Sequence, residues 1–432
     1  FIIDKNENLG SASKWWLHHS LISLDESLKL KNSKLYIFQG EPLKIIKKIV
    51  DKHKIYKVFW NRLYDQYSIK RDTNIKKILI ETKVEVLTFK GILLNEPWSI
   101  KNKNNSFFKV FTPFWKTCLE EMKPIKLIKA PKKIDTLFFN AEESMSIEEC
   151  KLFPKKSKWT KKLSTYWLPG EHHALINLKN FKNKVIEKYD EGRDRPDKNY
   201  TSKLSPYLHF GEISPDRVFE EINKMKIHNT ESRKKFLAEI GWREFSYNLL
   251  FNYPKIRSEP IQTKFMKFPW EKNFNYLNAW KEGKTGYPII DAGMRQLYET
   301  GWMHNRVRMI VGSFLVKHLL IDWKEGEKYF RNCLLDYSPA SNVAGWQWVA
   351  GCGADAAPYF RIFNPILQGE KFDKEGEYVK KWVPELKDLP KKFIHKPWEL
   401  NEGNFKLGRD YPYPVVIHEE ARVKALNAFK KI

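Results

Sequence analysis

The stretch NVAGWQWVAGCGADAAPYFRIFNP, residues 342–365, places two tryptophans among glycines and alanines, close to acidic residues. Small residues of this kind allow a backbone to approach a large flat group closely. Residues 351–356 also fit the pattern G-x-G-x-x-A of a dinucleotide-binding turn. That turn requires a long helix after it, but Pro358 and Pro365 interrupt the helix and no second strand follows. We therefore interpret 351–356 as a glycine-rich turn.

Composition indicates a globular protein with an affinity for polyanions. The 432 residues are enough for two or three domains, and no apolar run reaches the length of a membrane span. The formal net charge of +25 fits either solubility or a nucleic-acid partner, and 16 tryptophans add rings that can stack. The four cysteines form no C-x-x-C pair, so the sequence predicts no metal site or disulfide framework and favours a reducing, cytoplasmic location.

The first part of the chain alternates β-rich runs with helical patterns, which predicts a parallel α/β domain over residues 1–95. The β-rich runs lie at 34–39, 57–61 and 84–89, and the helical patterns lie at 13–30, 41–54 and 64–82. The opening residues FIID resemble the end of a strand, and the chain begins with Phe1. We therefore expect a chain that is incomplete at its N-terminus.

The rest of the chain divides into a connector and a helical domain. Residues 96–165 are rich in Lys and Pro with weak periodicity, which favours a connector, and 166–432 read as helices separated by Pro and Gly turns. The clearest helical patterns lie at 215–225, 232–251, 289–300, 303–320 and 325–335, followed by a basic helix at 416–432. No internal repeat is present.

The segment TSKLSP, residues 201–206, has features of a phosphate site. Ser205 is a good N-cap and Pro206 a good first helical residue, with Thr201, Ser202 and Lys203 just outside the helix. A helix start with hydroxyls and a cation suits a phosphate. A simple capping motif explains the same residues equally well.

Two further helices carry polar and aromatic faces. On helix 232–251 the side chains that share one face are Phe236, Glu239, Trp242, Arg243 and Ser246. A surface pair of Glu239 with Arg243 beside a core Trp explains that face without any function. In TGWMHNRVRM, residues 300–309, Trp302, Asn305 and Met309 share a face that a basic solvated surface explains poorly. No hydrolase, zinc-protease or P-loop motif is present.

These segments together resemble the photolyase/cryptochrome family. The longest are GKTGYPIIDAGMRQLYETGWMHNRVRMI (283–310) and GWQWVAGCGADAAPYFRIFNPILQGEKFD (345–373), supported by SKWWLHHSL (13–21), FTPFW (111–115), TSKLSPYLHFGEISP (201–215) and WREF (242–245). The resemblance covers essentially the whole chain and is strongest to a class I-type cyclobutane pyrimidine dimer (deoxyribodipyrimidine) photolyase. It implies an α/β N-terminal Rossmann-like antenna domain, here lacking its first strand, and an all-α FAD-binding domain.

The resemblance implies a set of cofactor contacts. The expected FAD-binding residues are Tyr189, Thr201, Ser202, Lys203, Leu204, Ser205, Phe236, Glu239, Arg243, Asn305, Arg308, Asp336, Asn342 and Trp346. Asn342 is expected beside flavin N5, with Asp336 paired to Arg308, and Asp355 and Asp373 fall within flavin-side segments. Lys203 stands where many relatives have Arg, and Ser338 where many have Asp. An antenna chromophore would be a folate by default, or a deazaflavin.

The resemblance also implies light-driven repair of cyclobutane pyrimidine dimers in DNA, in which excited reduced FAD donates an electron to the dimer. Trp242 and Trp348 would enclose the flipped lesion and Met309 would pack on it. Glu239 and Asn305 would bond the base edges. The expected contacts to flanking phosphates are Arg193 and Arg306. The expected redox relay, from flavin to surface, is Trp346, Trp323 and Trp270.

Three other readings are weaker. A (6-4) photolyase would carry histidines at Asn305 and Met309, which this chain lacks. A cryptochrome photoreceptor would more often lose the pair of Glu239 and Trp242, carry Asp at position 342 and add a long tail. A non-catalytic DNA-binding protein explains the charge but not the flavin segments. We expect a monomer that acts on DNA and does not enter a membrane.

Overall fold

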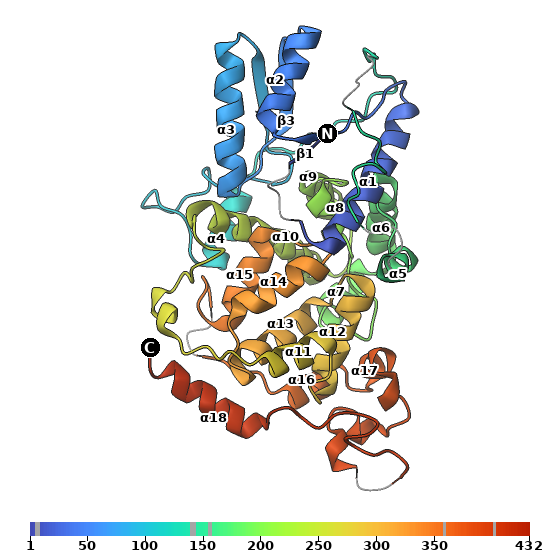
Figure 1. Ribbon diagram of the computed structural model, residues 1–432, viewed down its shortest axis with the longest axis vertical. Coiled ribbons are helices and arrows are strands. Elements are labelled where there is room, and N and C mark those ends of the chain that lie inside the picture. The colour runs from blue at the N-terminus through green and yellow to red at the C-terminus, as the bar shows by residue number, and fades with distance from the viewer. Residues whose placement is uncertain (5–8, 139–143, 154–157, 357–359, 401–402) are drawn as a thin grey trace.

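The computed structural model describes the chain except residues 5–8, 139–143, 154–157, 357–359 and 401–402. The described residues form a small α/β part and a larger helical part (Figure 1). The elements of the α/β part are β1 (Ile2–Asp4), α1 (Ser11–Lys29), β2 (Phe38–Gly40), α2 (Pro42–His53), β3 (Lys57–Asn61), α3 (Gln66–Glu81) and β4 (Glu85–Phe89). The two predicted classes of architecture therefore follow one another along the chain as expected.

The four strands form two separate parallel pairs. Strand β1 pairs with β2, with Ile2 opposite Phe38, and β3 pairs with β4, with Lys57 opposite Glu85. The parallel direction was predicted correctly. Within the described residues the two pairs are not joined into one sheet, and β2 begins at Phe38, later than the run from residue 34 suggests.

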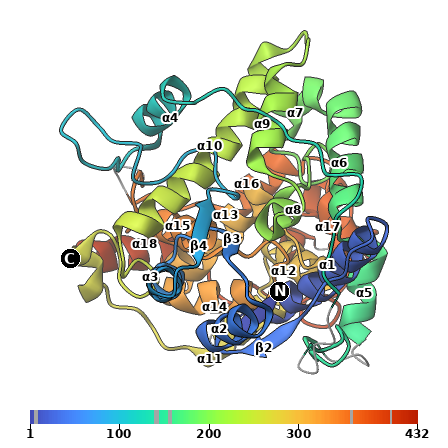
Figure 2. The ribbon, with the colours of Figure 1, turned by 90° about the horizontal axis from the view of Figure 1, so that it is seen from above.

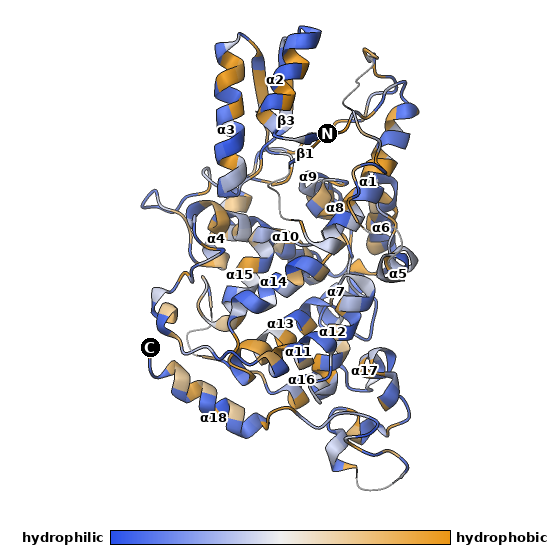
Figure 3. Ribbon diagram, in the orientation of Figure 1, coloured by the Kyte–Doolittle hydropathy of each residue, from blue (hydrophilic) through white to orange (hydrophobic). Residues whose placement is uncertain are grey.

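Strands β3 and β4 bury one face and expose the other, because successive side chains of a strand alternate between faces. Val58 and Val86 pack in a cluster with apolar residues of α2 and α3. Phe59, Leu87 and Phe89 point to the opposite face and stay exposed. Figure 3 shows hydrophobic and hydrophilic residues mixed along α2 and α3, as expected of helices that cover one side of a strand pair.

The expected connector contains two helices and returns to the α/β part. Helix α4 spans Phe111–Glu120 and α5 spans Lys158–Tyr166. The amide of Ile134 donates to the Lys31 carbonyl at 2.9 Å, and Met145 forms an antiparallel bridge with Ile37. The domain boundaries at residues 95 and 165 stay a prediction.

The helical part follows the predicted patterns closely. Its α-helices are α6 (Glu171–Lys184), α7 (Tyr189–Gly192), α8 (Ser205–Phe210), α9 (Pro215–Asn223), α10 (Thr230–Asn252), α11 (Phe274–Glu282), α12 (Pro288–Thr300), α13 (Asn305–Ser313), α14 (Trp323–Cys333), α15 (Pro339–Ala350), α16 (Pro365–Phe372), α17 (Glu377–Trp382) and α18 (His418–Phe429). The helix predicted at 303–320 is instead α13 followed by a π-helical turn over Phe314–His318. Helix α10 packs against α4 and α15 (Figure 2).

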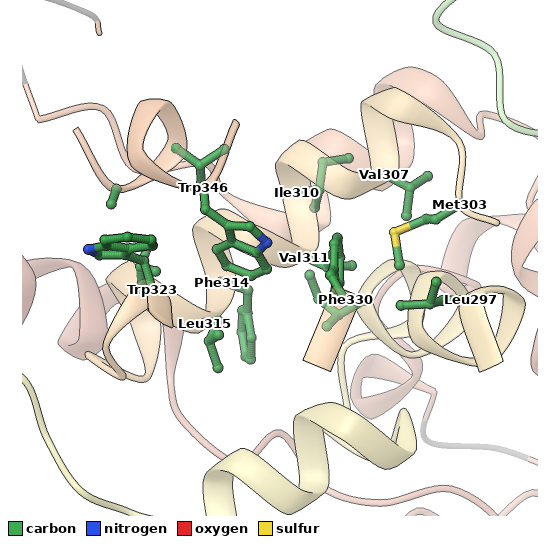
Figure 4. Close-up of a cluster of buried hydrophobic side chains, with 14 of the residues drawn as sticks. Leu297, Met303, Val307, Ile310, Val311, Phe314, Leu315, Trp323, Phe330 and Trp346 are labelled. Atoms are coloured by element: carbon green, nitrogen blue, oxygen red, sulfur yellow. The ribbon is translucent and has the colours of Figure 1, made fainter. Parts of the chain in front are cut away.

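The largest buried cluster lies in the helical part. Ile310 and Val311 of α13 meet Phe314 of the π turn, Phe330 of α14 and Trp346 of α15 (Figure 4). Burial of these apolar side chains holds the helices at fixed distances from one another. Among the described residues, no helix combines the length and apolarity needed to cross a membrane.

Candidate functional site

A cavity of about 590 Å³ opens between α8, α10, α13 and α15, within the usual size range of cofactor sites. Its wall unites segments that are far apart in the sequence. The predicted FAD and DNA contacts that line it are Tyr189, Arg193, Thr201, Ser202, Lys203, Leu204, Ser205, Phe236, Glu239, Trp242, Arg243, Asn305, Arg306, Arg308, Met309, Asp336, Asn342, Trp346 and Trp348. Of the predicted site residues, only Trp323 and Trp270 lie outside the lining.

Helix α10 supplies one wall of the cavity. Asn229 caps its start by accepting the Ser232 amide at 3.0 Å. Side chains spaced three and four residues apart then face the same way. The cavity lining includes all five predicted side chains, Phe236, Glu239, Trp242, Arg243 and Ser246, together with further α10 residues such as Ile240 and Tyr247. The periodicity of this segment therefore identified a true cavity face.

The carboxylate of Glu239 is held by a cation from another element. Arg193, directly after α7, places its guanidinium 2.6 Å from Glu239. The surface pair of Glu239 with Arg243, considered from the sequence, is wrong. A helical spacing of four residues allows that pair, but the guanidinium of Arg193 reaches Glu239 from the end of α7, which packs against α10.

Arg243 instead ties the cavity wall to the loop after β4. Its guanidinium donates to the Ile92 carbonyl and lies over the Tyr247 ring at 5.1 Å. The neighbouring Glu244 accepts the amides of Leu94 and Asn95 at 2.9 and 3.0 Å. Burial raises the pKa of Glu244 to about 7. Helix α10 thus links the cavity to the α/β part through both side chains.

A buried carboxylate anchors the side of the cavity near α13. Arg308 pairs with Asp336 at 2.9 Å, as the resemblance predicts. The Ser205 hydroxyl donates to the same carboxylate at 2.6 Å, and the Arg308 Nε donates to the Met303 carbonyl at 2.8 Å. These contacts fix the Arg308 side chain while it still lines the cavity.

The orientation of Asn342 is fixed by residues that the sequence reasoning missed. Its Nδ2 lies 3.4 Å from the carboxylate of Glu327, which is buried and also accepts the Tyr337 hydroxyl at 2.9 Å. This pairing, which is assigned from the hydrogen-bond network, leaves the Asn342 Oδ1 for the cavity. Glu327 lies four residues after Trp323 on α14, a spacing that marks a shared helix face.

The segment 201–205 lines the cavity but does not cap a helix as expected. The N-cap of α8 is Leu204 and Ser205 is already helical, so the prediction that Ser205 is the N-cap is wrong. The Ser205 hydroxyl is used by Asp336 instead. Lys203 adopts a positive φ of 52° and places its ammonium 5.8 Å from the centre of the Trp302 ring.

The two arginines expected to hold DNA phosphates both carry carboxylate partners. Arg193 pairs with Glu239, and Arg306 pairs with Asp194 at 2.8 Å. The Arg306 guanidinium also lies 4.4 Å from the centre of the Phe372 ring. Both arginines line the cavity. A phosphate at either arginine would therefore compete with the carboxylate or use the guanidinium N–H groups that the carboxylate leaves free.

The three tryptophans of the expected relay belong to one apolar cluster. Trp346 and Trp323 are buried in it (Figure 4). Trp270 packs against the same cluster. Trp346 also contacts Trp280 at a ring separation of 6.1 Å, and Trp280 contacts Tyr329 at 5.7 Å. Sequence reasoning missed this second aromatic branch, because no periodicity connects its members. The order of the relay stays a prediction.

The two acidic residues near the glycine-rich segment do not line the cavity. Asp373 is fully buried and accepts the amides of Tyr378 and Val379 at 2.9 and 3.0 Å, which caps α17. Asp355 does not line the cavity, but its carbonyl accepts the indole N–H of Trp348, which does. Gly351 adopts a positive φ of 86° and ends α15, so the glycine-rich turn interpretation is confirmed.

The cavity wall fits FAD in its donor chemistry. The hydroxyls of Thr201 and Ser202 and the Lys203 cation gather on one side, as a pyrophosphate requires. The Nδ1 of His209 is buried on the wall without a hydrogen-bond partner among the described residues. Burial lowers the pKa of His209 to about 4, so the ring is neutral and can bond a polar cofactor atom. No group of three or more potential metal ligands occurs in the described part of the chain.

Comparisons with known proteins agree with this geometry. Residues 1–133 match the family model of DNA photolyase, and residues 236–431 match the FAD binding domain of DNA photolyase. A deoxyribodipyrimidine photo-lyase from Agrobacterium fabrum (strain C58) is 45% identical over 430 residues, which cover 98% of this chain and 90% of the relative. Cryptochrome-2 from Arabidopsis thaliana is 38% identical over 441 residues, which cover 98% of this chain and 72% of the relative.

A solved structure supports the same assignment. A bacterial class III photolyase from Agrobacterium tumefaciens superposes with a TM-score of 0.97 at 44% identity, covering 100% of this chain and 90% of that one. Its class differs from the class I-type that the sequence resemblance suggests. The family models cover residues 1–133 and 236–431, and the relatives and the superposed structure extend over 98–100% of the chain. The chain belongs to the photolyase/cryptochrome family.

Proposed function

We propose that the protein is a deoxyribodipyrimidine photo-lyase, which splits cyclobutane pyrimidine dimers in DNA under blue light. One observation carries the proposal: the same cavity combines the predicted FAD contacts with Trp242, Trp348, Met309 and Asn305. Reduced FAD, when bound and excited, supplies the electron that opens the cyclobutane ring and receives it back. The remaining steps belong to the side chains of this protein.

The protein first has to extract the lesion from the duplex. Flipping costs least for a distorted pair, so a dimer leaves the stack more readily than an intact base. Trp242 and Trp348 offer aromatic surfaces on which the flipped bases stack, and Met309 fills the space beside them. This stacking would replace the interactions that the bases lose in the duplex.

Polar groups then orient the dimer against the cofactor. Glu239 and Asn305 line the same cavity and provide hydrogen-bonding groups for the base edges. Because Arg193 holds the Glu239 carboxylate at 2.6 Å, that side chain is preorganised before DNA arrives. Arg306 would exchange Asp194 for a flanking phosphate, and Arg193 would bind a second phosphate through its remaining N–H donors, so Glu239 keeps its partner.

A cryptochrome-type photoreceptor is the second candidate, favoured by the 38% identity to cryptochrome-2 from Arabidopsis thaliana. The cavity nevertheless retains Glu239 and Trp242, which a cryptochrome would more often lose, and Asn342, where a plant cryptochrome would carry Asp. Asn305 and Met309 line the cavity where a (6-4) photolyase would carry histidines. Repair of cyclobutane dimers is therefore the better supported function.

The decisive experiment irradiates the FAD-loaded protein with blue light in the presence of an oligonucleotide that carries one cyclobutane dimer. We expect restoration of the intact pyrimidines in the light and none in the dark, with a (6-4) oligonucleotide left unchanged. Absence of repair by reduced, FAD-loaded protein would favour the photoreceptor. Repair of the (6-4) product would overturn the assigned lesion class.

Several finer features belong to the same proposal. We propose class III over class I-type, because the superposed class III structure reaches a TM-score of 0.97. We also propose a monomer that acts in the cytoplasm, where the four buried free cysteines stay reduced. An antenna chromophore would be a folate by default or a deazaflavin. The division at residues 95 and 165 into antenna domain, connector and helical domain completes the proposal.

A further inference from the structure

The ring of Trp242 is held from behind by an aromatic residue that does not line the cavity. Phe111, the first residue of α4, stacks on Trp242 with ring centres 3.8 Å apart and planes 8° from parallel. The Phe245 ring meets both at an edge, 6.1 Å from Phe111 and 5.9 Å from Trp242. One face of the Trp242 ring is therefore covered, and the ring cannot tilt without breaking the stack.

A single acidic residue connects this stack to the other tryptophan. The Phe111 amide donates to the Asp355 carboxylate at 3.3 Å. The main-chain carbonyl of the same Asp355 accepts the indole N–H of Trp348 at 2.9 Å. Asp355 thus connects the surroundings of the two tryptophans: its side chain accepts the Phe111 amide beside the Trp242 stack, and its backbone carbonyl accepts the Trp348 indole.

The backbone of Asp355 shows that this connection is conformationally demanding. Its φ of 52° lies in the left-handed region, which Gly and Asn tolerate best and which costs other residues free energy. Unusual backbone conformations of this kind persist where the surrounding contacts hold them. The two hydrogen bonds of Asp355 are such contacts: one comes from the Phe111 backbone amide and the other from the Trp348 indole, which lines the cavity.

We propose that Phe111 and Asp355 are positioning residues that fix the spacing and tilt of Trp242 and Trp348, and thereby the preference for a flipped dimer over an ordinary nucleotide. The proposal rests on the proposed function, because it assumes that the two tryptophans enclose the lesion. Neither residue would contact the DNA. Their effect would reach the bound bases only through the two indole rings.

The test measures dark binding of the FAD-loaded protein to two oligonucleotides that differ only by one cyclobutane dimer. The dissociation constant for the undamaged oligonucleotide divided by that for the dimer-containing one measures discrimination, and this ratio does not depend on repair. Phe111→Leu removes the stack while keeping most of the volume, and Asp355→Gly removes the carboxylate while suiting the positive φ. Each should lower the ratio about 3- to 10-fold, the range expected for losing one aromatic stack or one hydrogen bond.

Conservative variants and a matched control separate positioning from general damage. Phe111→Tyr keeps the ring and Asp355→Asn keeps an oxygen acceptor, so both should restore the wild-type ratio. Phe107→Leu removes a nearby aromatic that packs edge-on against Tyr253 instead of Trp242, and it should leave the ratio unchanged. FAD content and affinity for undamaged DNA should stay at wild-type levels in all these variants.

The double variant Phe111→Leu with Asp355→Gly gives the sharpest outcome. Residues that act through one chain of contacts are non-additive, so the double variant should lose little more than either single one. Fully additive losses, or an unchanged ratio in Asp355→Gly, would overturn the proposal. Trp242→Ala and Trp348→Ala serve as references. If these two also leave the ratio unchanged, the failure lies in the proposed lesion pocket itself.

Discussion

Removal of Arg306 should remove one phosphate contact from the DNA complex. The side chain lines the cavity, pairs with Asp194 at 2.8 Å and is 20% exposed, so its cation can reach a phosphate by exchanging partners. Each phosphate that a protein cation neutralises releases condensed counterions from the DNA. The salt dependence of binding therefore counts such contacts directly.

The expected size of the effect follows from that counting. One contact contributes a slope of about 0.9 in log affinity against log salt, which is about 3.5-fold between about 50 and about 200 mM salt. Wild-type affinity should therefore fall about 3.5-fold more than that of Arg306→Ala over this range. Asp194→Asn releases the same arginine and should raise affinity by up to about 5-fold with an unchanged slope, since such a partly exposed pair contributes about 0–1 kcal/mol.

The assay is fluorescence anisotropy of a labelled, dimer-containing oligonucleotide in the dark, at several salt concentrations. Arg295→Ala is the matched control, because Arg295 also pairs with a carboxylate, Glu385 at 2.7 Å, and is 24% exposed, but does not line the cavity. A wild-type slope in Arg306→Ala would refute a phosphate contact. An equal change in Arg295→Ala would assign the effect to net charge.

Three further predictions concern electron supply, the lesion contact and pH. Trp323→Phe should no longer allow an external donor to photoreduce oxidised FAD, which is measured by absorbance, but the chemically reduced variant should still repair dimers normally. If Trp280→Phe loses photoreduction and Trp323→Phe does not, the relay runs through the second aromatic branch. Glu239→Ala should lower the repair yield per absorbed photon severalfold more than dark DNA binding, whereas proportional losses would contradict a direct lesion contact. Because burial raises the pKa of the Glu244 carboxyl from 4.5 to about 7, the free energy of unfolding of the wild type should fall as pH rises through that interval. Urea unfolding should show a smaller fall in the free energy of unfolding for Glu244→Gln between about pH 5 and about pH 8.

The periodicity of apolar and polar residues predicted well where helices lie and which side chains share a helix face. The helix predicted at 232–251 is α10, because an apolar and polar period of three to four residues describes a helix without reference to its neighbours. The same spacing placed five side chains on the cavity wall. The signal fails at element ends: Ser205 is helical instead of capping α8, since Asp336, 131 residues away, takes its hydroxyl.

Resemblance supplied what periodicity could not. No spacing rule connects Tyr189, Asn305 and Trp348, yet all three line one cavity. The family resemblance placed all three in one predicted site, and the structure brings them to one cavity wall. Their roles toward FAD and DNA follow from the same likeness and are open to the experiments above.

Tertiary structure alone decided which partners the site residues take. The sequence by itself determined that Glu239 and Arg243 lie on one helix face, but their spacing could not reveal that Arg193, 46 residues earlier, is the partner of Glu239. The stack of Phe111 on Trp242 and the separation of the strands into two pairs are equally invisible in sequence. Residue periodicity and helix capping depend on residues within about one helical turn. These contacts depend instead on how whole helices and strands pack to bury their apolar faces.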